Sequence, residues 1–223
     1  MTPDVEREKR LAAEAAAELV ENGMTVGLGT GSTVAYLLPA LARRSLSARY
    51  VTTSQPTEAG ANAVGLDVEA FAGIAHLDIA IDGADQIAPD GWLVKGGGGA
   101  HTHEKLVAVT ADRFVVIADS TKLVEQLHSP IPLELLSFGL DSTLRRVAPT
   151  TLREVPKSPD GGVIADFRGE VGDPAMLSEL FGATPGIIEH GIFPCDLVHS
   201  ILIGRGRDVE MRVVVHRSRT ASH

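Results

Sequence analysis

Short apolar runs alternate with helical patterns along the first half of the chain. Four runs have the length and continuous apolar character of buried strands, at residues 26–28, 50–53, 77–81 and 114–118. Three stretches between them are predicted to be helices, at residues 34–43, 55–64 and 103–109. This alternation predicts an α/β fold with a mainly parallel, doubly wound sheet, because parallel strands are joined through crossover helices.

A further helix is predicted at the N-terminus. Thr2 is a suitable N-cap, and Pro3 would occupy the first helical position. Leu11, Ala15 and Leu19 are spaced so that they share one face of this helix. The mixture of acidic and basic residues in the segment differs from the charged flank and apolar core of a secretory signal.

The pattern changes near Ser129, where a second region begins. Predicted strands at residues 152–155, 163–167 and 187–193 surround a predicted helix at residues 174–181, which indicates a small α+β unit. Two further apolar runs, 198–203 and 209–215, would close this unit and return to the first sheet. We therefore expect a discontinuous larger domain, residues 1–128 and 204–223, and a smaller domain, residues 129–203.

A glycine-containing turn, GLGTGST, follows the first predicted strand and leads into a helix. It offers the backbone amides and hydroxyls of Thr30, Gly31, Ser32 and Thr33 at the amino end of that helix, an arrangement that favours anion binding. The turn lacks the lysine of a P-loop and the third glycine of a dinucleotide motif. An ordinary helix cap by Ser32 or Thr33 is the alternative interpretation.

Residues 82–105, DGADQIAPDGWLVKGGGGAHTHEK, carry the densest candidate chemistry. The segment contains Asp82, Asp85, Lys95, four consecutive glycines at 96–99, and Glu104. A strand, a glycine turn and a helix in this order bring backbone N–H groups and the positive end of a helix to one point. The segment predicts a catalytic site, and a flexible surface loop is the alternative.

Composition narrows the class of protein. The chain has 223 residues, 44% hydrophobic and 22% charged, which is ordinary for a soluble globular protein. The formal net charge of -9 argues against general nucleic-acid binding, which depends on clustered basic residues. Cys195 is the only cysteine, which excludes an internal disulfide and fits a reducing cytoplasm. No apolar run is long enough to span a membrane.

Six motifs, in order along nearly the whole chain, resemble those of A-type ribose-5-phosphate isomerases: GLGTGST, TTSQPT, DGADQI, KGGGGAHTHEK, IADSTK and PGIIEHGIF. The resemblance implies a Rossmann-like domain with a smaller α+β domain, and a homodimer or homotetramer. It implies interconversion of ribose 5-phosphate and ribulose 5-phosphate through an enediolate, in the non-oxidative pentose phosphate pathway. A sugar phosphate is then the expected partner, and no cofactor is expected.

The resemblance also implies roles for individual residues. Glu104 would be the base that moves the carbon-bound proton, and Lys95 would stabilise the developing oxyanion. Asp82 would handle hydroxyl protons and ring opening, while Asp85 would hold substrate hydroxyls. The remaining substrate-binding residues, for the phosphate or the sugar, would be Thr30, Gly31, Ser32, Thr33, Gly83, Ala84, Gly96, Gly97, Gly98 and Lys122.

His101 and His103 depart from the family pattern, which commonly has a non-polar residue and an arginine there. HTHE could instead supply a metal pair, with Asp82 or Asp85 as a further ligand. The sequence is also compatible with a non-catalytic sugar-phosphate sensor and with a CoA transferase that uses a glutamate nucleophile. The segment 142–155 is shorter than the family pattern, which leaves the small domain and its subunit contacts less defined.

Overall fold

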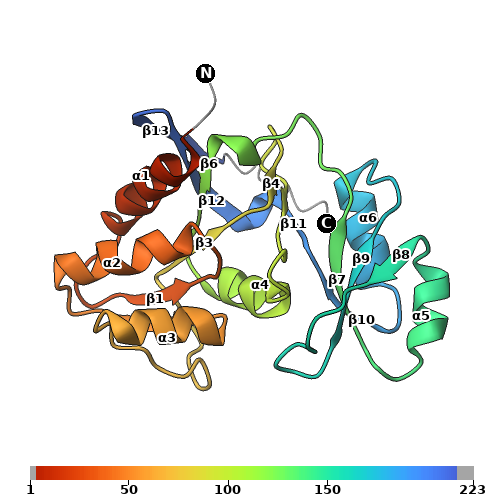
Figure 1. Ribbon diagram of the computed structural model, residues 1–223. Coiled ribbons are helices and arrows are strands. Elements are labelled where there is room, and N and C mark those ends of the chain that lie inside the picture. Colours follow the sequence, from red (N-terminus) through yellow and green to blue (C-terminus); the bar gives the residue numbers. More distant parts are fainter. Residues whose placement is uncertain (1–3, 215–223) are drawn as a thin grey trace, which may run out of the picture.

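The computed structural model, which describes residues 4–214, contains a larger and a smaller unit (Figure 1). The larger unit is built on a sheet with the strand order β13-β12-β6-β3-β1-β2. Its strands are β1 (Thr25–Leu28), β2 (Arg49–Thr52), β3 (Ile79–Gly83), β6 (Phe114–Asp119), β12 (Val198–Arg205) and β13 (Asp208–Val213). Neighbouring strands are parallel except β12 and β13, which confirms the predicted mainly parallel sheet.

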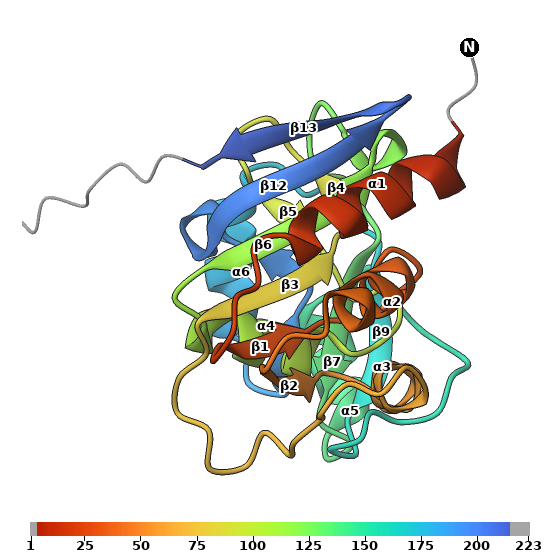
Figure 2. The ribbon, with the colours of Figure 1, turned by 90° about the vertical axis from the view of Figure 1, so that its left-hand side faces the viewer.

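Helices cover both faces of this sheet, as predicted from the continuous apolar strands. Figure 2 shows α1 (Val5–Ala17) and α2 (Val34–Arg44) in front of the sheet, and α4 (His101–Thr110) behind it; α3 (Gln55–Ala63) lies on the side of α2. Alternate residues of β6 face the two layers. Val115 and Ile117 pack in the cluster with α1 and α2, while Val116 and Ala118 pack in the cluster with α4.

Helix α1 differs from its predicted description at its start and on its buried face. Asp4 is the N-cap and accepts a hydrogen bond from the Arg7 backbone N–H at 3.3 Å. The predicted cap Thr2 and the following Pro3 lie outside the described residues. The predicted apolar face, with Leu11, Ala15 and Leu19, is only partly buried. The small alanine side chains on the neighbouring face allow a closer approach to the sheet. The buried residues of the helix are Glu8, Ala12, Ala13, Ala16 and Ala17.

The smaller unit is an antiparallel sheet with the order β10-β7-β9-β8. Its elements are β7 (Ile131–Leu135), α5 (Leu140–Arg146), β8 (Thr150–Leu152), β9 (Val163–Phe167), α6 (Pro174–Gly182) and β10 (Ile187–His190). The predicted strand at 163–167 and the predicted helix from Pro174 are confirmed. Of the strand predicted at 152–155, only Leu152 lies in a strand, because β8 ends there. Pro156 has no backbone N–H, so it could not donate to a neighbouring strand if β8 were longer.

Gly191 ends β10 and begins a separate connection between the two units. The strand predicted at 187–193 is therefore interrupted at Gly191: residues 187–190 form β10, whereas β11 (Ile192–Phe193) joins a different sheet with β5 (Leu93–Val94) and β4 (Gln86–Ile87). The Lys95 N–H donates to the Gly191 carbonyl at 2.8 Å. A Cβ at Gly191 would lie 2.2 Å from the Lys95 carbonyl oxygen, so only glycine allows this approach.

The C-terminal strands belong with the larger sheet. β12 begins at Val198 and runs parallel to β6, although residues 198–203 were expected in the smaller domain. The run predicted at 209–215 corresponds to β13, and its last residue, Val215, lies outside the described residues. We propose a division into residues 4–128 with 198–214, and residues 129–190, joined by 191–197. Among residues 4–214, no helix has the length and apolar character needed to cross a membrane.

Candidate active site

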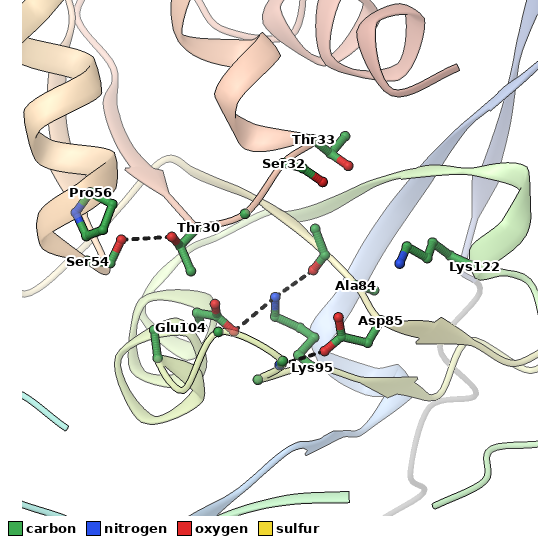
Figure 3. Close-up of a pocket in the computed structure, with 16 residues that line it drawn as sticks. Thr30, Ser32, Thr33, Ser54, Pro56, Ala84, Asp85, Lys95, Glu104 and Lys122 are labelled. Carbon is green, nitrogen blue, oxygen red and sulfur yellow. Dashed lines mark hydrogen bonds and ion pairs between the residues drawn. The ribbon is translucent and has the colours of Figure 1, made fainter. Parts of the chain in front are cut away.

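A cavity of about 350 Å³ lies beyond the carboxyl ends of β1, β2, β3 and β6 (Figure 3). Its position follows from the fold, because the loops after parallel strands meet at one edge of the sheet. Every residue expected in the site lines it except Asp82: Thr30, Gly31, Ser32, Thr33, Gly83, Ala84, Asp85, Lys95, Gly96, Gly97, Gly98, Glu104 and Lys122. The prediction omitted Ser54, Pro56 and Ala100, which also line the cavity.

Lys95 lies between two carboxylates on the floor of this cavity. Its Nζ is 2.8 Å from Asp82 Oδ2 and 3.2 Å from Glu104 Oε2, and it donates to the Gly83 carbonyl at 2.5 Å. All three charged side chains are at most 4% exposed. The ammonium group comes from the end of β5, whereas the carboxylates come from β3 and the first turn of α4.

Burial and the local charges change the pKa values of this cluster. Burial and, to a smaller extent, the neighbouring Asp82 charge together raise the pKa of Glu104 to about 8, against the opposing effect of Lys95. Burial also raises the pKa of Asp82, although Lys95 opposes the change. Burial alone would lower the pKa of Lys95, but the two carboxylates raise it above its ordinary value. Glu104 can therefore take up and release a proton near neutral pH.

Asp82 joins the first glycine turn to the end of β3. Its Oδ1 accepts hydrogen bonds from the Thr30 N–H at 3.1 Å and the Gly83 N–H at 2.6 Å. A Cβ at Gly29 would lie 1.7 Å from Asp82 Cγ, so Gly29 is needed for this approach. Asp82 is thus buried behind Lys95 and fixes the position of the first turn.

The second glycine turn closes over Asp85. The Gly97 N–H donates to Asp85 Oδ2 at 2.8 Å, and a Cβ at Gly97 would lie 2.9 Å from Asp85 Oδ1. Gly96 has φ of +100° and Gly99 has φ of +76°, in the region that favours glycine. Gly96, Gly97 and Gly98 therefore form part of the cavity wall, which favours the predicted site over a flexible surface loop.

The first glycine turn leads into the amino end of α2. Thr33 is the N-cap of this helix, as the alternative interpretation expected, but its side chain forms no capping hydrogen bond. Ser54 Oγ donates to Thr30 Oγ1 at 2.8 Å, which links the turns after β1 and β2. Figure 3 places the Lys122 side chain across the cavity from these turns. Hydroxyls, a helix amino end and a cation together favour an anionic group.

The two histidines that depart from the family pattern have separate surroundings. His101 is buried, and burial lowers the pKa of its imidazole to about 3. His103 Nε2 lies 2.6 Å from Asp160 Oδ2, and its Nδ1 lies 3.2 Å from the Thr53 carbonyl oxygen. Within residues 4–214, no three His, Cys, Asp or Glu side chains are placed to hold a metal ion. The geometry therefore gives the metal-pair alternative no support.

Comparisons with known proteins agree with this arrangement. Residues 49–208 match the family model described as ribose 5-phosphate isomerase A (phosphoriboisomerase A). The chain is 41% identical to "Ribose-5-phosphate isomerase A" of Methanosarcina acetivorans, over 94% of this chain and 95% of the relative. It is similar to the crystal structure of ribose 5 phosphate isomerase A from Neisseria gonorrhoeae, with a TM-score of 0.90 and 28% identity over 96% of this chain and 100% of that one.

Another similar structure is a D-ribose-5-phosphate isomerase in complex with phospho-erythronic acid. It has a TM-score of 0.89 and 29% identity, and the match covers 94% of this chain and 99% of that one. Both the family model and the full-length similarity agree with the motifs that line the cavity. The chain therefore belongs to the ribose 5-phosphate isomerase A family.

Proposed function

We propose that Glu104 is the catalytic base in the reaction of this family, the interconversion of D-ribose 5-phosphate and D-ribulose 5-phosphate. The chain is an aldose–ketose isomerase. The observation that supports this role for Glu104 is its placement on the cavity wall, with its carboxylate 3.2 Å from Lys95 Nζ. A buried carboxyl whose pKa is about 8 is well matched to removing a proton from carbon near neutral pH.

The reaction needs one proton moved between adjacent carbons. In the direction from aldose to ketose, Glu104 takes the proton from C2 and the electron pair forms the enediolate. Glu104 then returns the proton to C1, while a hydroxyl proton moves between O2 and O1. Lys95 would lie beside the oxygen that gains negative charge, and a buried cation stabilises such a charge most during the reaction.

Asp82 has a more indirect position than the sequence indicated. It is 2.8 Å from Lys95 Nζ and does not line the cavity, whereas Asp85 does. We therefore assign to Asp82 the task of orienting Lys95 and keeping it protonated. Asp85 would hold the sugar hydroxyls.

The phosphate would lie at the amino end of α2, with Ser32, Thr33 and Lys122 around it. A relative has been solved with phospho-erythronic acid, which carries a phosphate at one end and a carboxylate at the other. The two carboxylate oxygens resemble those of an enediolate. A compound of this shape would reach from the α2 end of the cavity to Lys95.

The assembly and location of the chain are also part of the proposal. We propose a homodimer or homotetramer in the cytoplasm. The exposed apolar side chains Met176 and Leu180, on α6, support a contact between copies, because large exposed apolar groups favour association. The single cysteine, Cys195, fits a reducing compartment. Sedimentation analysis of the purified chain tests the assembly, and a monomer at micromolar concentration would contradict it.

A coupled assay for ribulose 5-phosphate formation tests the proposed reaction and base together. The wild-type chain should convert ribose 5-phosphate, with and without chelator, and Glu104→Gln should lose most of this activity. Binding of ribose 5-phosphate without turnover by the wild type would favour a sensor. Activity lost to chelator and restored by zinc would favour metal catalysis, and thioester exchange with CoA would favour a transferase.

A further inference from the structure

Arg153 connects the smaller unit to the wall of the catalytic cavity. It follows β8, and its Nη1 donates to the carbonyl oxygens of Gly96 at 3.0 Å and Gly97 at 2.9 Å. Arg153 does not itself line the catalytic cavity. Arg153 therefore restrains the glycine turn through two consecutive carbonyl groups, from the side that faces away from the cavity.

Asp166 on β9 fixes the direction of this guanidinium group. Asp166 Oδ1 accepts from Arg153 Nε at 3.0 Å and from Nη2 at 2.6 Å. The Arg153 side chain is 18% exposed and that of Asp166 is 10% exposed, so solvent screens the pair only in part. The pairing leaves Nη1 directed at the glycine turn, and the planar fork of arginine suits this geometry better than a lysine ammonium.

The first peptide unit held by Arg153 also holds Asp85. The Gly96 carbonyl accepts from Arg153, and the N–H of the same peptide, which belongs to Gly97, donates to Asp85 Oδ2 at 2.8 Å. Donation to a carbonyl oxygen polarises the conjugated N–H and strengthens the bond that it gives. The second peptide unit consists of the Gly97 carbonyl, which accepts from Arg153, and the N–H of Gly98, a residue on the cavity wall.

Glycine has more accessible backbone conformations than any other residue, so the shape of this turn depends on its hydrogen bonds, which include the Gly99 N–H to the Gly96 carbonyl at 3.0 Å as well as those from Arg153. We propose that Arg153 is a positioning residue for the isomerase reaction. Held by Asp166, it fixes and polarises the two peptide units that present Gly97 and Gly98 to Asp85 and the cavity. This inference rests on the proposed function of the cavity, and it adds a residue from the smaller unit that does not touch substrate.

Two variants remove the restraint in different ways. Arg153→Lys keeps the charge but loses the fork, and the double variant Arg153→Met with Asp166→Asn removes both charges without leaving a buried charge unpaired. Arg168→Met is the matched control, because Arg168 lies 3.4 Å from the same carboxylate and is half exposed. The measurements are kcat and KM for ribose 5-phosphate, the affinities for phospho-erythronic acid and inorganic phosphate, and Tm.

We expect both Arg153 variants to lower kcat about tenfold, with KM changed less than about threefold, since misplaced groups affect the transition state most. Phospho-erythronic acid should bind about tenfold more weakly, whereas inorganic phosphate should bind as in the wild type. Arg168→Met should retain wild-type kinetics. A kcat within about twofold of wild type in both Arg153 variants would overturn the inference.

A purely structural role gives a different pattern, which also overturns the inference. Phosphate affinity and Tm would then fall together with kcat, or Arg168→Met would lose as much activity as Arg153→Lys. Failure of the proposed function is separately visible, because it appears in the wild type and in Glu104→Gln. The phospho-erythronic acid affinity of the Arg153 variants does not depend on turnover.

Discussion

Two buried lysines approach the same aromatic ring but have different surroundings. Lys95 Nζ is 5.4 Å from the centre of the Phe193 ring, and Lys105 Nζ is 4.9 Å from it. Lys95 faces two carboxylates, Asp82 and Glu104, at the cavity. Lys105 pairs with one carboxylate, Glu189, at 2.6 Å and donates to the His190 carbonyl at 2.7 Å.

The difference is one of charge balance. The Lys95 cluster has one cation for two acidic groups, so burial leaves a proton on or near Glu104, whose pKa is raised to about 8. The Lys105 cluster has one cation for one carboxylate, and burial lowers the pKa of Lys105. A balanced buried pair joins α4 to β10, whereas an unbalanced one provides a group that can exchange protons.

Neutralising one carboxylate in each cluster gives the largest expected contrast. Glu104→Gln should lower kcat about 10² to 10⁴ fold, the usual contribution of a positioned general base, with a modest change in KM. Glu189→Gln removes the matching charge from the balanced cluster and should change kcat by less than about threefold. Steady-state kinetics with ribose 5-phosphate decide this, and near-normal turnover by Glu104→Gln would contradict the assignment.

Replacing each lysine by methionine sharpens the contrast between catalysis and stability. Lys95→Met should lower kcat about 10² to 10³ fold through lost charge stabilisation. Lys105→Met leaves Glu189 without its cation and should lower the free energy of unfolding by about 2 kcal/mol, with kcat changed little. Urea unfolding monitored by circular dichroism, together with kcat, separates the two effects. Equal kinetic losses in the two variants would show that both clusters serve the reaction.

The pH dependence of kcat/KM for the wild type tests whether the pKa of Glu104 is raised in the Lys95 cluster. In its proposed role as base, Glu104 must be ionised, so kcat/KM should rise about tenfold per pH unit below its pKa of about 8 and level off above it. Measurements from pH 6.5 upward avoid most of the second ionisation of the substrate phosphate, near pH 6. A flat profile between pH 6.5 and 9 would show that Glu104 is already ionised at neutral pH.

The sequence was sufficient to predict the first four strands of the larger sheet, the helices between them and most of the cavity, for a physical reason. Asp85, Lys95 and Glu104 come from one short segment, and the glycine turns follow strands whose carboxyl ends share one edge of the sheet. The same rule predicts that the turn after β2, residues 53–57, lies at that edge, although Ser54 was not among the predicted site residues. Lys122 was placed by the motif that follows β6.

Contacts between the units were not predictable in the same way. Arg153 reaches Gly96 only because β8 pairs with β9 and brings Asp166 beside it. β7 was missed because Pro130 and Pro132 interrupt its pattern, and proline is uncommon inside sheets. Such contacts depend on how whole elements pack, which local patterns do not encode.

The smallest expected effect links the unbalanced cluster to stability. The pKa of Glu104 is raised from its ordinary value of 4.5 to about 8. Between these values the folded chain keeps a proton that the unfolded chain has lost, so this group makes folding less favourable as pH rises from 4.5 to 8.

The Glu104→Gln variant cannot ionise at this position and therefore escapes this loss of stability. Relative to wild type, the variant should therefore gain about 2 kcal/mol in unfolding free energy between pH 6 and pH 8, since each pKa unit is worth about 1.4 kcal/mol and Glu104 has lost only part of its proton by pH 8. Chemical denaturation of both proteins at the two pH values measures the difference, with Glu189→Gln as the control. A difference that stays constant or shrinks with rising pH would mean that Lys95 already holds Glu104 ionised, and that the cluster gains its catalytic power at no cost in stability.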